Sequence, residues 1–226
     1  MNAVIVAVYA FLSLFAILSR RLALRVAPLA KTAPLSFLIL FILIAGCRTP
    51  FAGDLAGGRV FWLLMTAGLA CGLAGDIFLL NKSRWFRQGI LAFLAGHLCY
   101  SVAFLAIGQR PNWSALPGLA LYASVYIFFL FRLLVPRHRA RLPIALAYFT
   151  AIMGMALMAS FADAAITIRG SHSLFFPAAL LFTVSDGILA YRLFGRYTRL
   201  ADSLVLSTYY SAQGLMAASI VMALGW

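Results

Sequence analysis

The feature that most constrains this chain is a succession of long apolar runs separated by short polar gaps. A helix needs about 20 mostly apolar residues to cross the hydrocarbon core of a membrane. Eight runs approach or reach that length, and the second of them is the shortest. They cover residues 2–19, 32–47, 60–80, 88–108, 114–134, 142–161, 173–192 and 203–225. Because no long polar linker separates them, we expect residues 1–226 to form a single integral membrane domain.

The composition also indicates an all-α, polytopic membrane helix bundle of about eight transmembrane helices. Hydrophobic residues make up 65% of the chain and charged residues 10%, too few charges to cover a soluble domain of this length. The net charge is +13, but no basic helix or aromatic-basic patch occurs, so we exclude a nucleic-acid partner. No basic segment precedes the first run, so we expect a transmembrane helix that stays attached rather than a signal peptide.

The basic residues predict which way the helices point. Of the 18 lysines and arginines, 14 lie in or beside the first, third, fifth and seventh gaps, and four lie near the others. Cytoplasmic loops of membrane proteins carry such an excess of positive charge. We therefore expect both termini on the non-cytoplasmic side of a multi-pass membrane protein. In a bacterium this would be the plasma or inner membrane.

A few polar side chains fall inside the predicted spans. An ionisable group at the centre of a membrane helix costs about 2.5–3.5 kcal/mol on insertion scales, so such groups are functional candidates. Asp76, His97 and Asp186 lie in the third, fourth and seventh runs. Counted along their helices, all three belong to the half of the membrane nearest the basic gaps, as do the polar residues of the last run, Tyr209, Tyr210 and Gln213.

Helical spacing groups several of these residues. His97 and Tyr100 lie three positions apart and share a face, and Gln213 shares a face with Tyr209 or Tyr210. Small residues before Asp76 allow neighbouring helices to approach closely; they are Gly68, Gly72 and Gly75. The remaining aspartates lie in loops or at the ends of runs, where we expect ordinary solvated side chains; they are Asp54, Asp163 and Asp202.

The segments around these polar residues are characteristic when taken together. They read GLACGLAGDIFLL around Asp76, GILAFLAGHLCYSVAF around His97, LPIALAYFTAIMGMALM with Tyr148, LLFTVSDGILAYRLF around Asp186 and SLVLSTYYSAQGLMAAS around Gln213. In this order and spacing they resemble the YhhN-like lysoplasmalogenases, from about residue 60 to the C-terminus. The first two runs match that family in hydrophobicity alone. The stretch 177–179 reads Pro-Ala-Ala where the family tends to have Gly-Ala.

The resemblance implies an eight-helix membrane hydrolase that acts on lysoplasmalogens. These substrates are 1-alkenyl lysophospholipids with a choline or ethanolamine headgroup. Cleavage of their vinyl ether bond releases a fatty aldehyde and the glycerophospho-headgroup. We therefore expect a lysophospholipid substrate and the lipid bilayer as the partners of this chain, and we assign no metal and no cofactor.

The chemistry of the bond suggests roles for the polar residues. A vinyl ether resists base and yields to acid, because the hard step is protonation of an alkene carbon. The reaction needs one acid and one anion near the developing cation, and two carboxyl groups in unlike environments can divide these roles. Our hypothesis makes Asp76 and Asp186 the catalytic pair, with His97 as an orienting or proton-relaying group. Which aspartate is the acid stays open.

Other polar residues are candidates for substrate binding. These are Tyr100, Tyr148, Tyr209, Tyr210 and Gln213. Three arginines near the basic gaps could meet the lipid phosphate or could serve only as topology signals; they are Arg84, Arg87 and Arg192.

Other classes of function remain open at this point. Asp, His and Tyr inside a bundle also suit the proton relay of a coupled transporter, although the sequence contains no clear internal repeat. A metal hydrolase would use Asp76, His97 and Asp186 as ligands, a small and hard ligand set for zinc. The chain could instead hydrolyse another membrane lipid, or be a structural bundle in which the aspartates only hold helices together.

Overall fold

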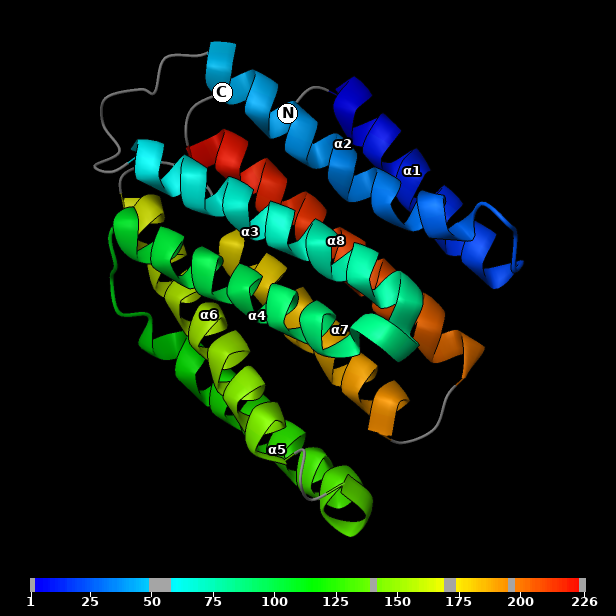
Figure 1. Cartoon of the computed structure of the whole chain (residues 1–226). Helices are drawn as coiled ribbons and strands as arrows, with labels where there is room; N and C mark the ends of the chain where they lie inside the picture. Colours follow the sequence, from blue (N-terminus) through cyan, green and yellow to red (C-terminus); the bar gives the residue numbers. More distant parts are fainter. Residues whose placement is uncertain (1–2, 49–57, 139–141, 169–173, 195–197, 224–226) are drawn as a thin grey trace.

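The apolar runs of the sequence fold as antiparallel helices. The computed structural model describes residues 3–48, 58–138, 142–168, 174–194 and 198–223. Within these residues the chain forms eight α-helices, two short 3-10 turns (Leu79–Asn81 and Trp113–Ala115) and no strand. The helices are α1 (Ala3–Arg21), α2 (Ala27–Arg48), α3 (Gly58–Phe78), α4 (Lys82–Ala106), α5 (Leu116–His138), α6 (Leu142–Ile168), α7 (Phe175–Phe194) and α8 (Arg199–Ala223) (Figure 1).

Each of the eight helices overlaps one of the eight predicted runs, which confirms the all-α membrane bundle. In the described part of the chain, six helices are long and apolar enough to cross a membrane by length and composition alone: α1, α2, α3, α4, α6 and α8. A shorter apolar stretch, Trp113–Phe129, covers the second 3-10 turn and the first part of α5. Polar residues interrupt the apolar sequence of α7, among them Ser185 and Asp186.

Successive helices run in opposite directions, so α1 begins and α8 ends at the same end of the bundle (Figure 1). The last turns of α1, α3, α5 and α7 and the first turns of α2, α4, α6 and α8 therefore meet at the opposite end, which we call the polar end because the charged clusters described below lie there. Helices α5 and α6 form one flank of the bundle, and α1 and α2 form the other.

Helix α4 changes direction near its start, at the polar end. The backbone of Trp85 is non-helical, with φ −119° and ψ 20°, so the first turn of the helix is separated from the rest by a kink. The guanidinium of Arg84 lies over the Trp85 ring, 5.0 Å from its centroid. Beyond the kink, α4 continues in regular geometry and presents Phe86, Ile90 and Phe93 to a cavity in the bundle.

Candidate active site

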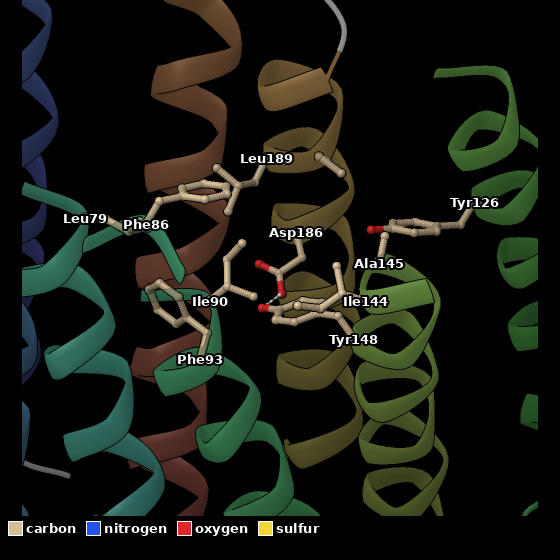
Figure 2. Close-up of a pocket in the computed structure, with 11 residues that line it drawn as sticks. Leu79, Phe86, Ile90, Phe93, Tyr126, Ile144, Ala145, Tyr148, Asp186 and Leu189 are labelled. Atoms are coloured by element: carbon tan, nitrogen blue, oxygen red, sulfur yellow. Dashed lines mark hydrogen bonds between the residues drawn. The ribbon is translucent and has the colours of Figure 1, made fainter. Parts of the chain in front are cut away.

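A first polar cluster joins α4, α6 and α7 through Asp186. The Tyr148 hydroxyl donates a hydrogen bond to Asp186 Oδ2 over 2.7 Å. The Nε2 atom of His97 lies 3.2 Å from the same carboxylate oxygen and 3.1 Å from the Tyr148 hydroxyl. Figure 2 shows Asp186 and Tyr148 pointing toward each other among apolar side chains. Both contacts fall on Oδ2, so within the described residues the other carboxylate oxygen of Asp186 has no protein partner.

Packing fixes the imidazole in this cluster. His97 is buried, and its ring meets the rings of Tyr148 and Phe182 edge to face, with centroids 5.5 Å apart in both pairs. Its Nδ1 atom has no hydrogen-bond partner among the described residues. Nε2 is therefore the ring nitrogen through which His97 can exchange a proton with Asp186 or Tyr148.

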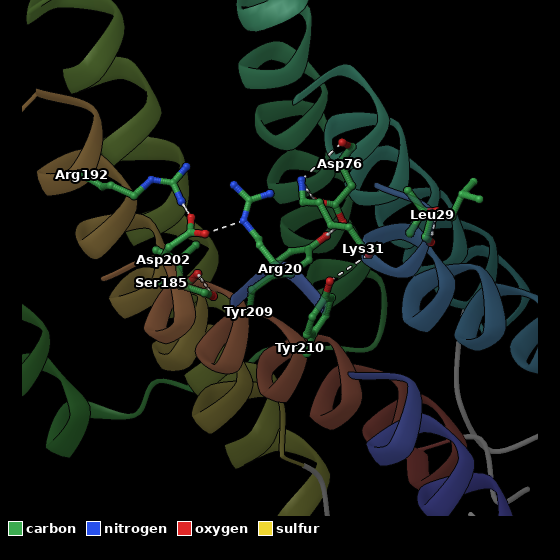
Figure 3. A network of polar contacts seen from close by, with 11 residues as sticks. Arg20, Leu29, Lys31, Asp76, Ser185, Arg192, Asp202, Tyr209 and Tyr210 are labelled. Atoms are coloured by element: carbon green, nitrogen blue, oxygen red, sulfur yellow. Dashed lines mark hydrogen bonds and ion pairs between the residues drawn. The ribbon is translucent and has the colours of Figure 1, made fainter. Parts of the chain in front are cut away.

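A second polar cluster joins α2, α3 and α8 through Asp76. Lys31 Nζ forms an ion pair with Asp76 Oδ1 over 2.8 Å and also reaches the Asp76 backbone oxygen at 3.3 Å. The Tyr209 hydroxyl donates to Asp76 Oδ2 over 3.0 Å. Both oxygens of this buried carboxylate are thus engaged, as a charge away from water requires. Figure 3 shows the ion pair of Lys31 and Asp76 beside the Arg20 side chain.

Three further hydrogen bonds brace the second cluster. The Tyr210 hydroxyl donates to the backbone oxygen of Lys31 over 2.8 Å, and the Tyr9 hydroxyl donates to the backbone oxygen of Tyr210 over 2.6 Å. The Tyr100 hydroxyl donates to Gln213 Oε1 over 3.0 Å, which ties α4 to α8. These bonds link α1, α2, α4 and α8 around Asp76.

One cavity brings the two aspartates together. It encloses about 510 Å³ of empty space including its mouth, and both Asp76 and Asp186 line it together with Tyr209. A second cavity, of about 640 Å³ on the same measure, lies against it and is lined almost wholly by apolar side chains of α4, α6 and α7 (Figure 2). Asp186, Leu79, Phe93 and Leu189 line both cavities. Asp186 therefore stands at the junction of an apolar and a polar space.

A third polar cluster lies at the polar end, where α1, α7 and α8 meet. Asp202 Oδ2 accepts from Arg20 Nε over 2.5 Å, and its other oxygen forms an ion pair with Arg192 (Figure 3). The prediction that Asp202 is an ordinary solvated residue is wrong, because the side chain is buried and held between two arginines.

The other two aspartates expected in loops have different outcomes. Asp163 lies within α6, and its carboxylate accepts hydrogen bonds from the backbone N–H groups of Phe175 and Phe176 at the start of α7. It satisfies donors that the first turn of a helix leaves unpaired, and the residue itself is half-buried. Asp54 lies outside the described residues.

The remaining candidate residues differ in whether they line a cavity. Tyr148 and Tyr209 line the cavities, whereas the hydroxyls of Tyr100 and Tyr210 and the side chain of Gln213 make their contacts with protein groups. The exposed arginines Arg84 and Arg87 are absent from the lining of both cavities, whereas Arg192 lines the polar one. A substrate contact for Tyr100, Tyr210 or Gln213 stays a prediction.

Sequence reasoning misses three charged residues of this region. The predicted run boundaries leave Lys31 in a gap, but it lies in the second turn of α2 and is buried. Arg20 counts there only as a topology signal, and Asp202 as a solvated residue. A signal is present for Asp202: it lies seven residues before Tyr209, which is two turns along one face of α8. The sequence carries no comparable signal for Lys31.

Two kinds of comparison relate the chain to known proteins. A family model described as the YhhN family matches residues 26–220, so the similarity includes the second helix as well as the segments that follow it. Among curated proteins, lysoplasmalogenase TMEM86B of Sus scrofa is 31% identical over 195 residues, which cover 86% of this chain and 75% of that protein. Lysoplasmalogenase TMEM86A of Homo sapiens is 32% identical over 203 residues, or 87% of this chain and 78% of that protein. No solved structure matches the chain significantly.

Proposed function

The chain belongs to the YhhN family, and on that premise we propose that it is a lysoplasmalogenase. It hydrolyses the vinyl ether bond of 1-alkenyl lysophospholipids with a choline or ethanolamine headgroup. One observation in the structure supports this function above all. Two carboxyl groups in unlike surroundings, Asp76 and Asp186, line one cavity, and that cavity adjoins an apolar one that can take a hydrocarbon chain.

The cavities suit the two halves of such a lipid. The walls of the apolar cavity are hydrophobic side chains such as Phe86, Ile90 and Ile144, and ligand pockets are lined mostly by side chains of this kind. The alkenyl chain would occupy this space. Its vinyl ether end would then lie at Asp186, where the apolar lining gives way to the polar cavity. The glycerol part of the headgroup would enter the polar cavity.

The reaction consumes one water molecule, and its first step places a proton on carbon. Asp186 donates a proton to the second carbon of the alkenyl chain, and the positive charge develops on the first carbon and the ether oxygen. Water adds to the first carbon and loses a proton. The resulting hemiacetal then breaks its bond to the glycerol oxygen, which takes a proton, while the hemiacetal hydroxyl loses its own proton and becomes the carbonyl of the aldehyde.

The surroundings of each aspartate support this division of roles. In the Asp186 cluster, His97 Nε2 touches the carboxylate and can return the proton that the substrate removes. Tyr148 orients the same carboxylate through its hydrogen bond. Asp76, paired with the Lys31 ammonium, is the anion that faces the developing cation and accepts the proton of the attacking water.

Aldehyde release from 1-alkenyl lysophosphatidylethanolamine by the purified protein in detergent tests the function. We expect activity in the wild type and a loss of at least about 100-fold in kcat for Asp186→Asn and for Asp76→Asn, the size typical of a removed general acid or base. The matched control is Asp163→Asn, which changes an aspartate that contacts α7 and lines neither cavity.

The outcomes separate the function from the assignment of residues. An inactive wild type that elutes as a folded protein would contradict the lysoplasmalogenase function. An active wild type with a fully active Asp186→Asn or Asp76→Asn variant would remove that residue from the mechanism while leaving the function in place.

A further inference from the structure

The proposed reaction leaves the third cluster, Arg20, Asp202 and Arg192, without a role. The Asp202 and Arg192 side chains are each less than 10% exposed, and Arg20 is 31% exposed. Burying two charged side chains, with a third only partly exposed beside them, is costly unless they are well paired. All three line the polar cavity, on its side toward the polar end of the bundle.

The cluster also stands at an opening. A further cavity, lined by Arg20, Arg21, Arg199 and Asp202, lies at the end of α1 and the start of α8. It shares Arg20, Asp202 and Leu206 with the polar cavity. Three spaces therefore follow one another: the apolar cavity, the polar cavity with both aspartates, and this outer basic cavity. Arg20 and Asp202 lie between the second and the third.

The charges of the cluster favour an anion. Of the other ionisable groups that line the polar cavity, Lys31 is offset by Asp76, and Asp186 contacts His97 and Tyr148. Asp202 offsets one of the two arginines, so the third cluster carries one positive charge in excess. Asp202 binds Arg20 through Nε, which leaves the two terminal nitrogens of that guanidinium without a partner in the described residues. Two parallel N–H donors on a fixed guanidinium suit a phosphate group.

From this geometry we propose that Arg20 and Arg192, held in place by Asp202, bind the phosphodiester of a single-chain phospholipid. The proposal rests on the proposed function for the position of the lipid. With the alkenyl chain in the apolar cavity and the vinyl ether at Asp186, the glycerol carbons lead through the polar cavity. The phosphate then reaches the two arginines, and the choline or ethanolamine group enters the outer cavity. Asp202 is a positioning residue in this arrangement.

A pair of substrates that differ only in the phosphate tests the proposal. One is 1-alkenyl lysophosphatidylethanolamine and the other is 1-alkenylglycerol, which has the same vinyl ether and no phosphate. For Arg20→Gln and for Arg192→Gln we expect the phospholipid to show a KM at least about tenfold higher, with kcat changed less than about threefold, because a charge-assisted contact to the phosphate is lost. With 1-alkenylglycerol as substrate, both variants should keep the wild-type KM within about twofold.

The matched control is Arg25→Gln. Arg25 is an exposed arginine between α1 and α2 at the same end of the bundle, and it lines neither the polar nor the outer cavity. We expect it to leave both KM values unchanged. If Arg20→Gln raised both KM values equally, or neither, the phosphate site would be refuted. If Arg20→Gln does not fold, Arg20→Lys keeps the charge and should show a smaller rise for the phospholipid alone; an equal change with both substrates would refute the site.

Binding provides a readout that does not depend on turnover. The saturated ether analogue 1-alkyl lysophosphatidylethanolamine keeps the chain and the phosphate but lacks the reactive double bond. Its dissociation constant, measured by equilibrium dialysis, should rise at least about tenfold in Arg20→Gln, and inorganic phosphate at equal concentration should not displace it. Unchanged binding, or displacement by inorganic phosphate, would overturn the proposal. An inactive wild type that binds the analogue through Arg20 would contradict the function and leave the phosphate site standing.

Discussion

A lysine buried beside an aspartate is the most consequential contact between single residues in this bundle. Lys31 Nζ reaches Asp76 Oδ1 at 2.8 Å, and the two side chains are 11% and 3% exposed. Neither charge has enough water around it to be stable alone. Removing one partner of a buried ion pair typically costs about 3–5 kcal/mol, because the other charge stays behind unpaired. The pair therefore couples the stability of α2 and α3 to the chemistry of Asp76.

At this scale we predict that Lys31→Met destabilises the protein more than Lys31→Met combined with Asp76→Asn. The single variant leaves a buried carboxylate without its ammonium, at a cost of up to about 3–5 kcal/mol, and the double variant removes that charge as well. Unfolding in mixed detergent micelles would measure the four free energies of the cycle. The exposed cation Arg25, changed to Met, serves as the control. A double variant as unstable as the single one would show that the ion pair is not the cause.

At the scale of elements, the glycines of α3 determine how closely other helices approach it. A Cβ atom added at Gly68 would lie 2.4 Å from the Tyr100 ring of α4, and one at Gly72 would lie 2.9 Å from Gln213 Nε2 of α8. The hydrogen bond between Tyr100 and Gln213 fixes both of these side chains. The glycines therefore allow side chains of α4 and α8 to pack closely against α3. The same close packing places Asp76 against Tyr209.

We predict that Gly68→Ala destabilises the bundle by about 1–3 kcal/mol, the usual cost of overpacking a filled core. The added methyl group would displace a ring that is fully buried and hydrogen-bonded. Gly154→Ala in α6 is the matched control, because nothing lies within 4 Å of its added Cβ. An apparent melting temperature in detergent would compare the two. Equal melting temperatures would mean that the contact between α3 and α4 relaxes without cost.

At the scale of the whole molecule, the polar clusters gather at one end of the bundle. The second and third clusters draw on residues near the ends of α1, α3 and α7 and the starts of α2 and α8, and the first cluster adjoins them through Asp186, which lines the same polar cavity. The predicted orientation turns this polar end toward the cytoplasm, because most of the basic residues flank it. A single-chain lipid would then present its headgroup to the site from the cytoplasmic side.

This orientation gives a direct prediction for the C-terminus. Alkaline phosphatase fused after Trp226 should be active in a bacterial host, and a green fluorescent protein at the same point should be dark, because both report a non-cytoplasmic end. Fusions after the arginines of the 192–199 gap should give the opposite pattern. A bright fluorescent fusion at Trp226 would reverse the predicted topology and place the polar end outside the cytoplasm.

The helices and the family could both be predicted from the sequence alone. Each helix follows from a run of apolar residues long enough to satisfy its backbone within the membrane, which is a local property of the chain. The candidates Asp76, His97 and Asp186 could also be read directly, because an ionisable residue within an apolar run stands out. The motifs around them were sufficient to indicate the family that the comparison identifies.

Which polar groups meet, by contrast, depends on how the helices pack in the folded bundle. Asp186 contacts Tyr148, and Asp76 contacts Lys31 and Tyr209, across sequence separations of 38, 45 and 133 residues. Helical spacing gives the face on which a residue lies but not the helix that this face meets. Lys31 and Asp202 stand near helix ends, where a charge can turn either to water or into the bundle. In this bundle each of them forms an ion pair with an oppositely charged residue, and the ion pair compensates the lost hydration of the charge.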